Sequence, residues 1–440
     1  MERLFEGFDL CASNTSVSKT INGNYWWHLA AFFTVAIRQQ VAKFEKENGR
    51  APTEAENAEI RATTLSTVRG TVQADQLKES MGQNTLVFNL DTALRMMGDV
   101  AEFYVENNVR NHYFVSISGY HIAEAGANPI TQAALTLSNG LTYVELFRAR
   151  GLDPDKFLRN FSWFFSNGMD PEYAVIGRVA RRIWAVAMRD VYNVGHRGQQ
   201  LKYHIQSSGR SLHAQEFTFN DFRTTLQALY ALADNANSLH TNSRDEAFGT
   251  PTEETVRDAI AIQLILGKEY GWLANENPLQ GSFLAEWLTS TVEEEILRLF
   301  EEMHRRGGVL GALEVNFQRN RIQDESMVYE HRKHSGELPI VGVNTFLNPD
   351  AASLSAEDAD SFDMNVTRSD KAEKLMVIER NIEFKKAHAT EAEADLAKLK
   401  QVARDGGNLF DCMMEIVEHC TVGQVTQALF ETGGKFRRNM

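Results

Sequence analysis

The chain has 440 residues, 43% of them hydrophobic, enough for one large α/β domain and a smaller one with apolar surface left for a partner. Its 45 basic and 59 acidic residues give a net charge of -14, which disfavours nucleic acid and anionic membranes as partners. The sequence has no apolar run of about 18 residues and no signal-peptide pattern at its start, so we expect a cytoplasmic protein.

From residue 15 to residue 242 the sequence repeats one unit: a short strand-like run that ends in polar residues, a loop, and an amphipathic helical stretch. This alternation predicts parallel βα units. The strand candidates begin at Thr15, Arg69, Phe114, Asn160, Tyr203 and Asn237. Their starts lie roughly 35 to 55 residues apart, a spacing typical of a (β/α) barrel.

The predicted strands carry polar residues along one face, because side chains alternate across a strand. The residues that share this face are Ser16, Ser18 and Thr20, then Ser116 and Ser118, then His204, Gln206 and Ser208. Barrels of this type usually fill their axis with Val, Ile and Leu. The pattern therefore favours an axis left open for an extended ligand; the alternative is that these are outward-facing or loop-end residues.

After about residue 285 helical patterns replace the strand signals. The predicted helices span Glu286 to His304, Asn320 to Arg332, Lys371 to Arg404 and Phe410 to Glu418. The stretch from Asn348 to Asp370 is rich in Ser, Asp and Ala and predicts a linker or exposed loop. We expect a barrel domain over residues 1–285 and a helical region over 286–440 that is a candidate dimer interface.

Several common site motifs are absent. The sequence has no GxxxxGK[ST] phosphate loop, no GxGxxG after a strand, no HExxH and no CxxC pair. The cysteines, Cys11, Cys412 and Cys420, are too few and too uneven for a disulfide framework. With His419 the last two make a possible metal cluster, but buried helix residues explain them better, so we predict no metal site.

Polar residues collect where the predicted strands end, on the face that carries the active sites of (β/α) barrels. They are Gln73, His121, Glu124, His204, Gln206, Gln215, His240, Asn242 and Glu246. A polar residue at a strand end is a structural cap as often as a catalyst. The pattern fits general acid and base chemistry without indicating a reaction.

The segments SISGYHIAEAGANPITQ, FFSNGMDPEY, IQSSGRSLHAQE, NSLHTNSRDEA and GELPIVGVNTFL resemble the methylmalonyl-CoA mutase family, most strongly its isobutyryl-CoA mutase branch of the fused type. The resemblance runs over almost the whole chain. It implies an eight-stranded (β/α) barrel of the TIM type with the pantetheine arm of CoA along the axis. It also implies a radical carbon-skeleton rearrangement of an acyl-CoA, with adenosylcobalamin as cofactor.

The resemblance also assigns roles to individual residues, although each of them has a structural alternative. His121 matches the histidine that donates a hydrogen bond to the thioester carbonyl. Positions that match the substrate pocket are Gln73, Gln83, Ser162, His204 and Gln206. Positions that match the cofactor side are Glu124, which faces the cofactor, and Asn242 and Glu246, which hold the adenosyl ribose.

Gln83 indicates the branch of the family. Methylmalonyl-CoA mutases have an arginine at the matching position, which pairs with the free carboxylate of the substrate. Gln83 offers no charge, so a dicarboxylic acyl group would be buried with its charge uncompensated. We therefore expect a monocarboxylic substrate such as isobutyryl-CoA or butyryl-CoA.

The sequence departs from the family in three ways. It lacks the DxHxxG motif that supplies the lower cobalt ligand, so a cobalamin-binding domain or small subunit is expected as partner. It begins at what the resemblance makes the helix before strand two, so the barrel should contain strands 2 to 8 and lack its first strand. It also reads SKTINGNYWW where the family has SMTINGPAP.

The last departure affects three side chains. Lys19 should point into the helix layer, a poor place for an unpaired ammonium. Trp26 and Trp27 add bulk near the acyl pocket, where they either pack in the core or reshape the site.

We expect the substrate-binding part of an adenosylcobalamin-dependent acyl-CoA mutase, an isomerase that converts isobutyryl-CoA to butyryl-CoA. It should be inactive without its cobalamin-binding partner and should pair as a homodimer through this large part. Two alternatives stay open at this point. The chain is a non-catalytic remnant or assembly module of such a mutase, or a related mutase with a different acyl-CoA substrate.

Overall fold

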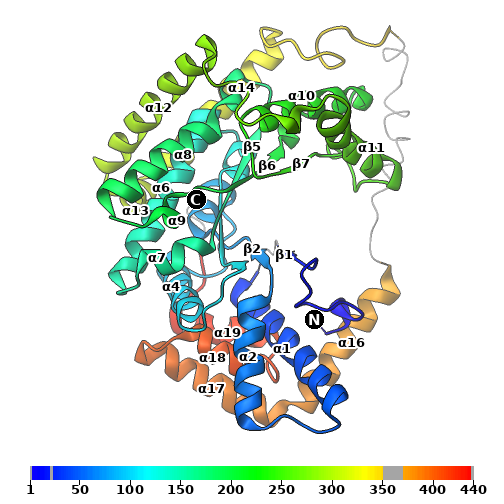
Figure 1. Ribbon diagram of the computed structural model, residues 1–440, viewed down its shortest axis with the longest axis vertical. Coiled ribbons are helices and arrows are strands. Elements are labelled where there is room, and N and C mark those ends of the chain that lie inside the picture. Colours follow the sequence, from blue (N-terminus) through cyan, green and yellow to red (C-terminus); the bar gives the residue numbers. More distant parts are fainter. Residues whose placement is uncertain (1, 20–22, 350–369, 438–440) are drawn as a thin grey trace.

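The computed structural model describes residues 2–19, 23–349 and 370–437. All six predicted strands are present and every pair is parallel. They are β1 (Val17–Lys19), β2 (Gly70–Val72), β3 (His112–Tyr113) continued after one residue by β4 (Val115–Ser118), β5 (Phe161–Asn167), β6 (Tyr203–Ser207) and β7 (Ser238–His240). The strand order is β1-β2-β3 in one sheet and β4-β5-β6-β7 in the other (Figure 1).

The α/β class is therefore confirmed, and the two sheets follow one another along a single broken strand. The resemblance predicts seven strands in this region. The described residues form six, when β3 and β4 are counted as one broken strand. β1 pairs only with β2, and β7 pairs only with β6, so each has a free edge among the described residues. Closure of the strands into a barrel stays a prediction.

Helices alternate with the strands and cover the outer faces of the sheets. The long ones are α1 (Tyr25–Asn48), α2 (Glu54–Thr67), α4 (Leu90–Glu106), α6 (Pro129–Ala149), α8 (Ile176–Val186), α10 (Asn220–Ala233) and α11 (Glu253–Leu264). The short ones are α3 (Gln76–Lys78), α5 (Tyr120–Glu124), α7 (Pro154–Phe157) and α9 (His196–Gln199). Side-chain caps start several of them: Asn128 accepts from the Thr131 N–H, and Thr53 with Glu56 forms a capping box.

The hydrophobic core lies between the strands and these helices, not on the axis. Ile117, Trp163 and Ile205 point outward from β4, β5 and β6, and each is at most 1% exposed. α6 approaches β5 so closely that a Cβ at Gly140 would lie 2.2 Å from the Trp163 ring. Only glycine fits there, because the helix backbone itself packs against the indole.

The opposite strand faces are polar, as predicted. The parallel register places Ser116 opposite Ser162, and Ser166 opposite Gln206, which in turn faces His240. On the other sheet Ser18 lies opposite Thr71, and Thr71 lies opposite Tyr113. Thr20 lies outside the described residues. The polar face runs across both sheets, interrupted by Phe164 opposite Ser118 and His204.

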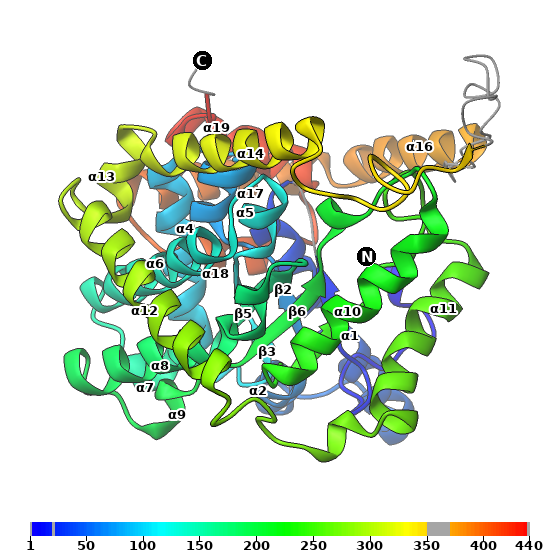
Figure 2. The ribbon, with the colours of Figure 1, turned by 90° about the horizontal axis from the view of Figure 1, so that it is seen from above.

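The helical region after residue 285 packs against the strand and helix layers. Its members are α12 (Phe283–His304), α13 (Gly308–Glu314), α14 (Phe317–Ser335), α16 (Lys371–Ala387), α17 (Ala389–Asp405), α18 (Leu409–Ile416) and α19 (Val422–Gly433). α12 packs on α6 and α8, whereas α18 packs on α1 and α4 (Figures 1 and 2). The domain division at residue 285 stays a prediction.

The helix prediction for Lys371 to Arg404 was wrong in one respect, since the structure has two helices that meet at His388. The His388 backbone leaves the helical region (φ -112°, ψ 25°), and its ring contacts Phe384 with centroids 4.6 Å apart. Most of the expected linker lies outside the described residues. None of the described helices is long and apolar enough to cross a membrane.

Trp26 and Trp27 open helix α1 and do not form a loop. Trp26 is 2% exposed and packs against Phe88, with ring centroids 5.9 Å apart. Trp27 donates its indole N–H to the carbonyl of Cys420 at 2.9 Å. These contacts favour core packing for both side chains over a reshaped site.

Lys19 lies where the strand alternation predicted, in the helix layer. The residue is 6% exposed, and its Nζ has no hydrogen-bond partner among the described residues. Its Nζ lies over the face of the Phe32 ring, 3.3 Å from the ring centroid, which is a cation–π contact. Burial lowers the pKa of Lys19 well below its ordinary value.

Lys19→Met should raise the free energy of unfolding at neutral pH by about 1–3 kcal/mol, because it removes an uncompensated buried amine. The unfolded chain holds the lysine proton up to about pH 10.4, whereas the folded chain loses it earlier, so wild-type stability rises with pH across that window. The difference in free energy of unfolding between Lys19→Met and the wild type should therefore shrink as the pH rises. Urea unfolding between neutral and alkaline pH measures it, with Lys46→Met on the exposed face of α1 as control. A less stable Lys19→Met protein contradicts this account.

Candidate active site

His121 stands directly after β4, on the short helix α5. Its Nδ1 lies 2.7 Å from Ser118 Oγ, the last residue of β4. Burial, followed by the charge of Lys78, lowers the pKa of His121 to about 3, so the imidazole is neutral at physiological pH. Nε2 makes no hydrogen bond within the described residues, and it carries the ring proton in the tautomer in which the Ser118 hydroxyl donates to Nδ1.

Gln206 links the end of β6 to the residues around it. Its amide nitrogen donates to the Tyr120 hydroxyl at 3.0 Å and to Asn242 Oδ1 at 2.8 Å. Asn242 in turn donates to the Ser207 carbonyl at 2.8 Å. The Tyr120 ring stacks on Phe164, with centroids 4.9 Å apart. The predicted residues Gln206 and Asn242 are thus joined in one hydrogen-bonded group with Tyr120, which the sequence analysis did not single out.

Glu124 is a largely enclosed carboxylate at the same edge. It accepts hydrogen bonds from Ser166 Oγ (3.2 Å), Ser208 Oγ (2.9 Å) and the Arg210 backbone N–H (2.8 Å). Burial raises the pKa of Glu124, and these hydrogen bonds act in the opposite direction. The carboxylate is therefore fixed in place between the ends of β5 and β6.

Glu246 lies in the loop after β7, exposed at the rim of the site. Its carboxylate makes no hydrogen bond within the described part of the chain, and its remaining burial and the neighbouring Asp245 raise its pKa. Burial raises the pKa of the Tyr120 hydroxyl, and the charges of Glu124 and Glu246 act in the same direction. The Glu246 carboxylate is therefore available to accept from the hydroxyls of a ribose. The Asn242 side chain is fully buried, and its amide is engaged by Gln206 and by the Ser207 carbonyl.

Gln73 and Gln83, which were predicted for the substrate side, lie on the segment that follows β2. Gln73 Oε1 is buried without a hydrogen-bond partner among the described residues, which leaves an acceptor for a ligand N–H or O–H. The amide nitrogen of Gln83, oriented so that both groups are satisfied, donates to Glu79 Oε2 at 2.9 Å. The backbone of Gly82 packs against His121 and Ile122, so this segment borders α5.

Ser162 and His204 lie further down the polar face, away from the strand ends. Ser162 is half-buried opposite Ser116. His204 Nδ1 lies 2.8 Å from Ser238 Oγ, and burial and the nearby His240 lower the pKa of His204 to about 4. Both residues therefore present uncharged polar groups to the axis.

A buried network that the sequence did not reveal supports these residues. Asp75 accepts from the Lys78 N–H (3.1 Å), the Ser118 N–H (3.1 Å) and the Tyr143 hydroxyl (2.8 Å). Lys78 pairs with Glu79 at 2.7 Å, and both side chains are at most 3% exposed. One contact could have been predicted from the sequence: Ser118 and His121 are three residues apart across a strand-to-helix turn, a spacing that lets their side chains meet.

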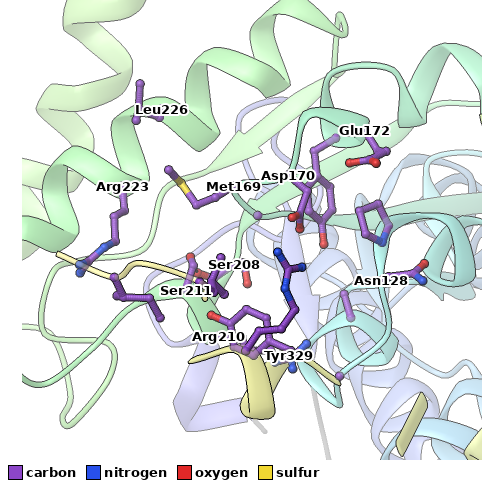
Figure 3. A pocket seen from close by; sticks show the side chains of 18 of the residues that line it. Asn128, Met169, Asp170, Glu172, Ser208, Arg210, Ser211, Arg223, Leu226 and Tyr329 are labelled. Carbon is purple, nitrogen blue, oxygen red and sulfur yellow. The ribbon is translucent and has the colours of Figure 1, made fainter. Parts of the chain in front are cut away.

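A cavity with a volume of about 850 Å³ lies beside the predicted residues. It opens between α10, α14 and the loops after β5 and β6, and Figure 3 shows Arg210, Asp170 and Tyr329 facing it. It shares Ser208 and Arg210 with the surroundings of Glu124 and includes none of the residues predicted for the site.

The cysteines are unpaired, and no group of His, Cys, Asp and Glu in the described part of the chain has a geometry suited to a metal ion. His419 instead lies 2.9 Å from Asp395, and Cys412 and Cys420 are buried in the helical region. The Glu246 carboxylate, which is exposed and makes no hydrogen bond within the described residues, fits the hydroxyl groups of an adenosyl moiety.

Comparison with known proteins gives the family. The family model for methylmalonyl-CoA mutase matches residues 1–435. A fused isobutyryl-CoA mutase of Geobacillus kaustophilus is 58% identical over 440 residues, all of this chain and 40% of that protein. The large subunit of a 2-hydroxyisobutanoyl-CoA mutase of Aquincola tertiaricarbonis is 33% identical, over 99% of this chain and 73% of the subunit.

Human mitochondrial methylmalonyl-CoA mutase is also 33% identical, over 99% of this chain and 54% of that enzyme. The chain spans about two fifths of the length of the fused relatives that it matches. The match nevertheless covers the strands, the polar axis and every residue of the candidate site. The chain belongs to the methylmalonyl-CoA mutase family.

Proposed function

We propose that this chain is the substrate-binding part of an adenosylcobalamin-dependent acyl-CoA mutase that interconverts isobutyryl-CoA and butyryl-CoA. The observation that carries the proposal is the neutral His121, held on Ser118 at the end of a polar strand face. The 58% identity to a fused isobutyryl-CoA mutase supports the substrate class. We also propose a cytoplasmic location and a homodimer formed through this large part.

In this proposal His121 positions the thioester. Its Nε2–H donates to the carbonyl oxygen, where electron density rises as the group migrates. A neutral donor suits this task, since an imidazolium could protonate the oxygen outright. Gln73 with its unpaired acceptor, together with Ser162, His204 and Gln206, would line the channel for the acyl-CoA.

Adenosylcobalamin, when bound, supplies the radical that removes a substrate hydrogen and returns it. Glu124 would face the cofactor, and Asn242 and Glu246 would hold the adenosyl ribose. Gln206 keeps Asn242 in place through its 2.8 Å hydrogen bond. The lower cobalt ligand would come from a cobalamin-binding domain or small subunit, because the DxHxxG motif that supplies it in the family does not occur in this sequence.

Gln83 supports a monocarboxylic acyl group. Its amide is engaged by the buried Glu79, whose carboxylate also accepts from Tyr25 at 3.0 Å, from Thr85 and from Lys78. A negative charge thus already stands behind Gln83. The negative charge of Glu79 would repel a free carboxylate on the substrate. The cation of this network, Lys78, is already paired with Glu79 and would not compensate that carboxylate.

The two free strand edges support a partner segment that closes the barrel. Val256, Ile260 and Leu264 form a stripe on the outer face of α11, and their exposed fractions of 42%, 53% and 49% show that nothing in the described part of the chain covers it. At the other edge a groove of about 680 Å³ runs beside β1, lined by Phe5, Phe8 and Leu10 among others. Such edges are normally paired or covered.

The first test combines the chain with adenosylcobalamin and the cobalamin-binding region of a fused relative, and follows conversion of isobutyryl-CoA. We expect turnover in the complemented form and none with the chain alone. His121→Ala should lower kcat about a hundredfold, the loss typical of a carbonyl donor of ~3 kcal/mol. His121→Gln keeps an amide donor and should fall between. A loss under about fivefold would mean that another group holds the carbonyl.

Gln83→Arg should raise KM for isobutyryl-CoA about tenfold, because it places a cation against an apolar acyl group, a difference of roughly 1.4 kcal/mol. It should also allow weak binding of a dicarboxylic acyl-CoA, because the introduced guanidinium can pair with the free carboxylate. Gln83→Met, of similar volume and uncharged, is the control. Steady-state kinetics with both substrates measure the change. Unaltered isobutyryl-CoA kinetics in Gln83→Arg would place residue 83 outside the acyl pocket.

Barrel closure is tested by adding the neighbouring barrel segment of a fused relative as a separate chain. The melting temperature and the affinity for CoA should both rise, because the segment covers two free edges and restores a wall of the axial channel. The control is the same segment with proline in the middle of its strand, which removes backbone donors. Equal stability and equal CoA binding with either segment would rule out closure by strand pairing.

A further inference from the structure

The residue proposed to face the acyl group, Gln83, ends a single π-helical turn, Glu79–Gln83, which follows directly on α3. Such turns are rare, and they occur frequently at functional sites. Asn84 closes the turn with a positive φ of 55°, a left-handed conformation that few residues other than glycine adopt. A backbone of this shape persists where surrounding contacts hold it in place.

One of these contacts comes from Arg319 on helix α14. Its guanidinium donates to the Ser80 carbonyl at 2.8 Å, at the start of the turn. The same nitrogen, Nη2, donates to Asn84 Oδ1 at 3.3 Å, directly after the end of the turn. A side chain 239 positions away from Ser80 in the sequence thus bridges both ends of the turn that carries Gln83.

The opposite side of the turn contacts α5, the helix that carries His121. A Cβ at Gly82 would lie 3.7 Å from the His121 carbonyl oxygen, so the two backbones are in close contact. Within the turn, Glu79 holds the Gln83 amide at 2.9 Å. Gln83 is therefore fixed between α5 and α14, and a shift of the turn would change the distance between Gln83 and His121.

Helix α14 is anchored independently of this contact. Ser326, two turns after Arg319 on the same face, packs so closely on Gly126 that a Cβ there would clash. The Tyr329 ring, one turn further on, lies under the Arg210 guanidinium at 4.2 Å. Removing the Arg319 side chain should therefore release the turn without displacing the helix.

We propose that Arg319 is a positioning residue for the acyl group, because it fixes the turn that places Gln83 relative to His121. It acts through Gln83, and we assign it no contact with substrate or cofactor. This inference rests on the function proposed above, in which Gln83 selects among acyl groups. Loosening the turn should accordingly weaken binding of the acyl-CoA and leave the rearrangement itself nearly unchanged.

Kinetics of the complemented mutase with isobutyryl-CoA test this role. Arg319→Met keeps the apolar stem and removes the donors, so KM should rise about tenfold, the loss expected for hydrogen bonds from a charged group. The value of kcat should change less than about threefold, because Ser118 holds His121 separately. Arg319→Lys retains one charged donor and should restore part of the KM. A fall in kcat as large as the rise in KM contradicts a positioning role in binding.

The matched control is Arg332→Gln, on the same helix, where the arginine forms an exposed pair with Glu337 at 3.0 Å. It should change KM less than about twofold. Action through Gln83 is tested in Gln83→Met protein, where Arg319→Met should add less than about twofold to KM. Thermal unfolding checks that each variant is folded. A tenfold effect of Arg319→Met in that background, or an equal effect of Arg332→Gln, overturns the proposal.

Amide hydrogen exchange separates this inference from the proposed function, since it needs no turnover. In the unliganded chain, the amides of Glu79–Gln83 should exchange at least about tenfold faster in Arg319→Met than in the wild type. Arg332→Gln should leave their exchange unaltered. Absence of turnover in the unaltered, complemented protein would contradict the proposed function, whereas unaltered exchange in Arg319→Met would contradict the role of Arg319.

Discussion

A single buried carboxylate, Asp75, joins the two sheets of this fold. It follows β2 in the first sheet and accepts the backbone N–H of Ser118 at the end of β4 in the second. It also accepts from the hydroxyl of Tyr143 on α6 and from the N–H of Lys78, whose helical turn it caps. A fully buried charge is costly unless such partners surround it. The strand break at Phe114 is therefore held together by hydrogen bonds that no apolar side chain could supply.

The chemistry of the site depends on the same residues. Ser118 offers its backbone N–H to Asp75 and its hydroxyl to His121, so one residue fixes both the sheet junction and the imidazole. The Lys78 ammonium, which offsets the charge of Asp75, also helps to keep His121 neutral. Replacing Ser118 or Lys78 would therefore alter both the sheet junction and the electrostatic environment of His121.

How far the sequence predicts the fold is clear from particular residues. Alternation located every strand and the polar face, because both depend on local periodicity, and it placed Lys19 correctly in the helix layer. It could not predict the Asp75 network, whose members are brought together across as many as 68 positions of sequence. Nor could it predict the bend at His388, where alternating charge is compatible with one helix or two. The site residues came from resemblance, and the structure adds the contacts that orient them.

The polar strand face has a consequence for how the protein can evolve. Apart from Phe164, the described strands carry polar groups or Tyr113 on the inner side, so the fold forgoes the inner layer of Val, Ile and Leu that stabilises most barrels. Replacing Ser116 or Ser162 with valine would add buried apolar surface and narrow the proposed channel at the same time. Laboratory selection for heat resistance alone would therefore tend to seal the axis. An open channel persists only while binding is selected together with stability.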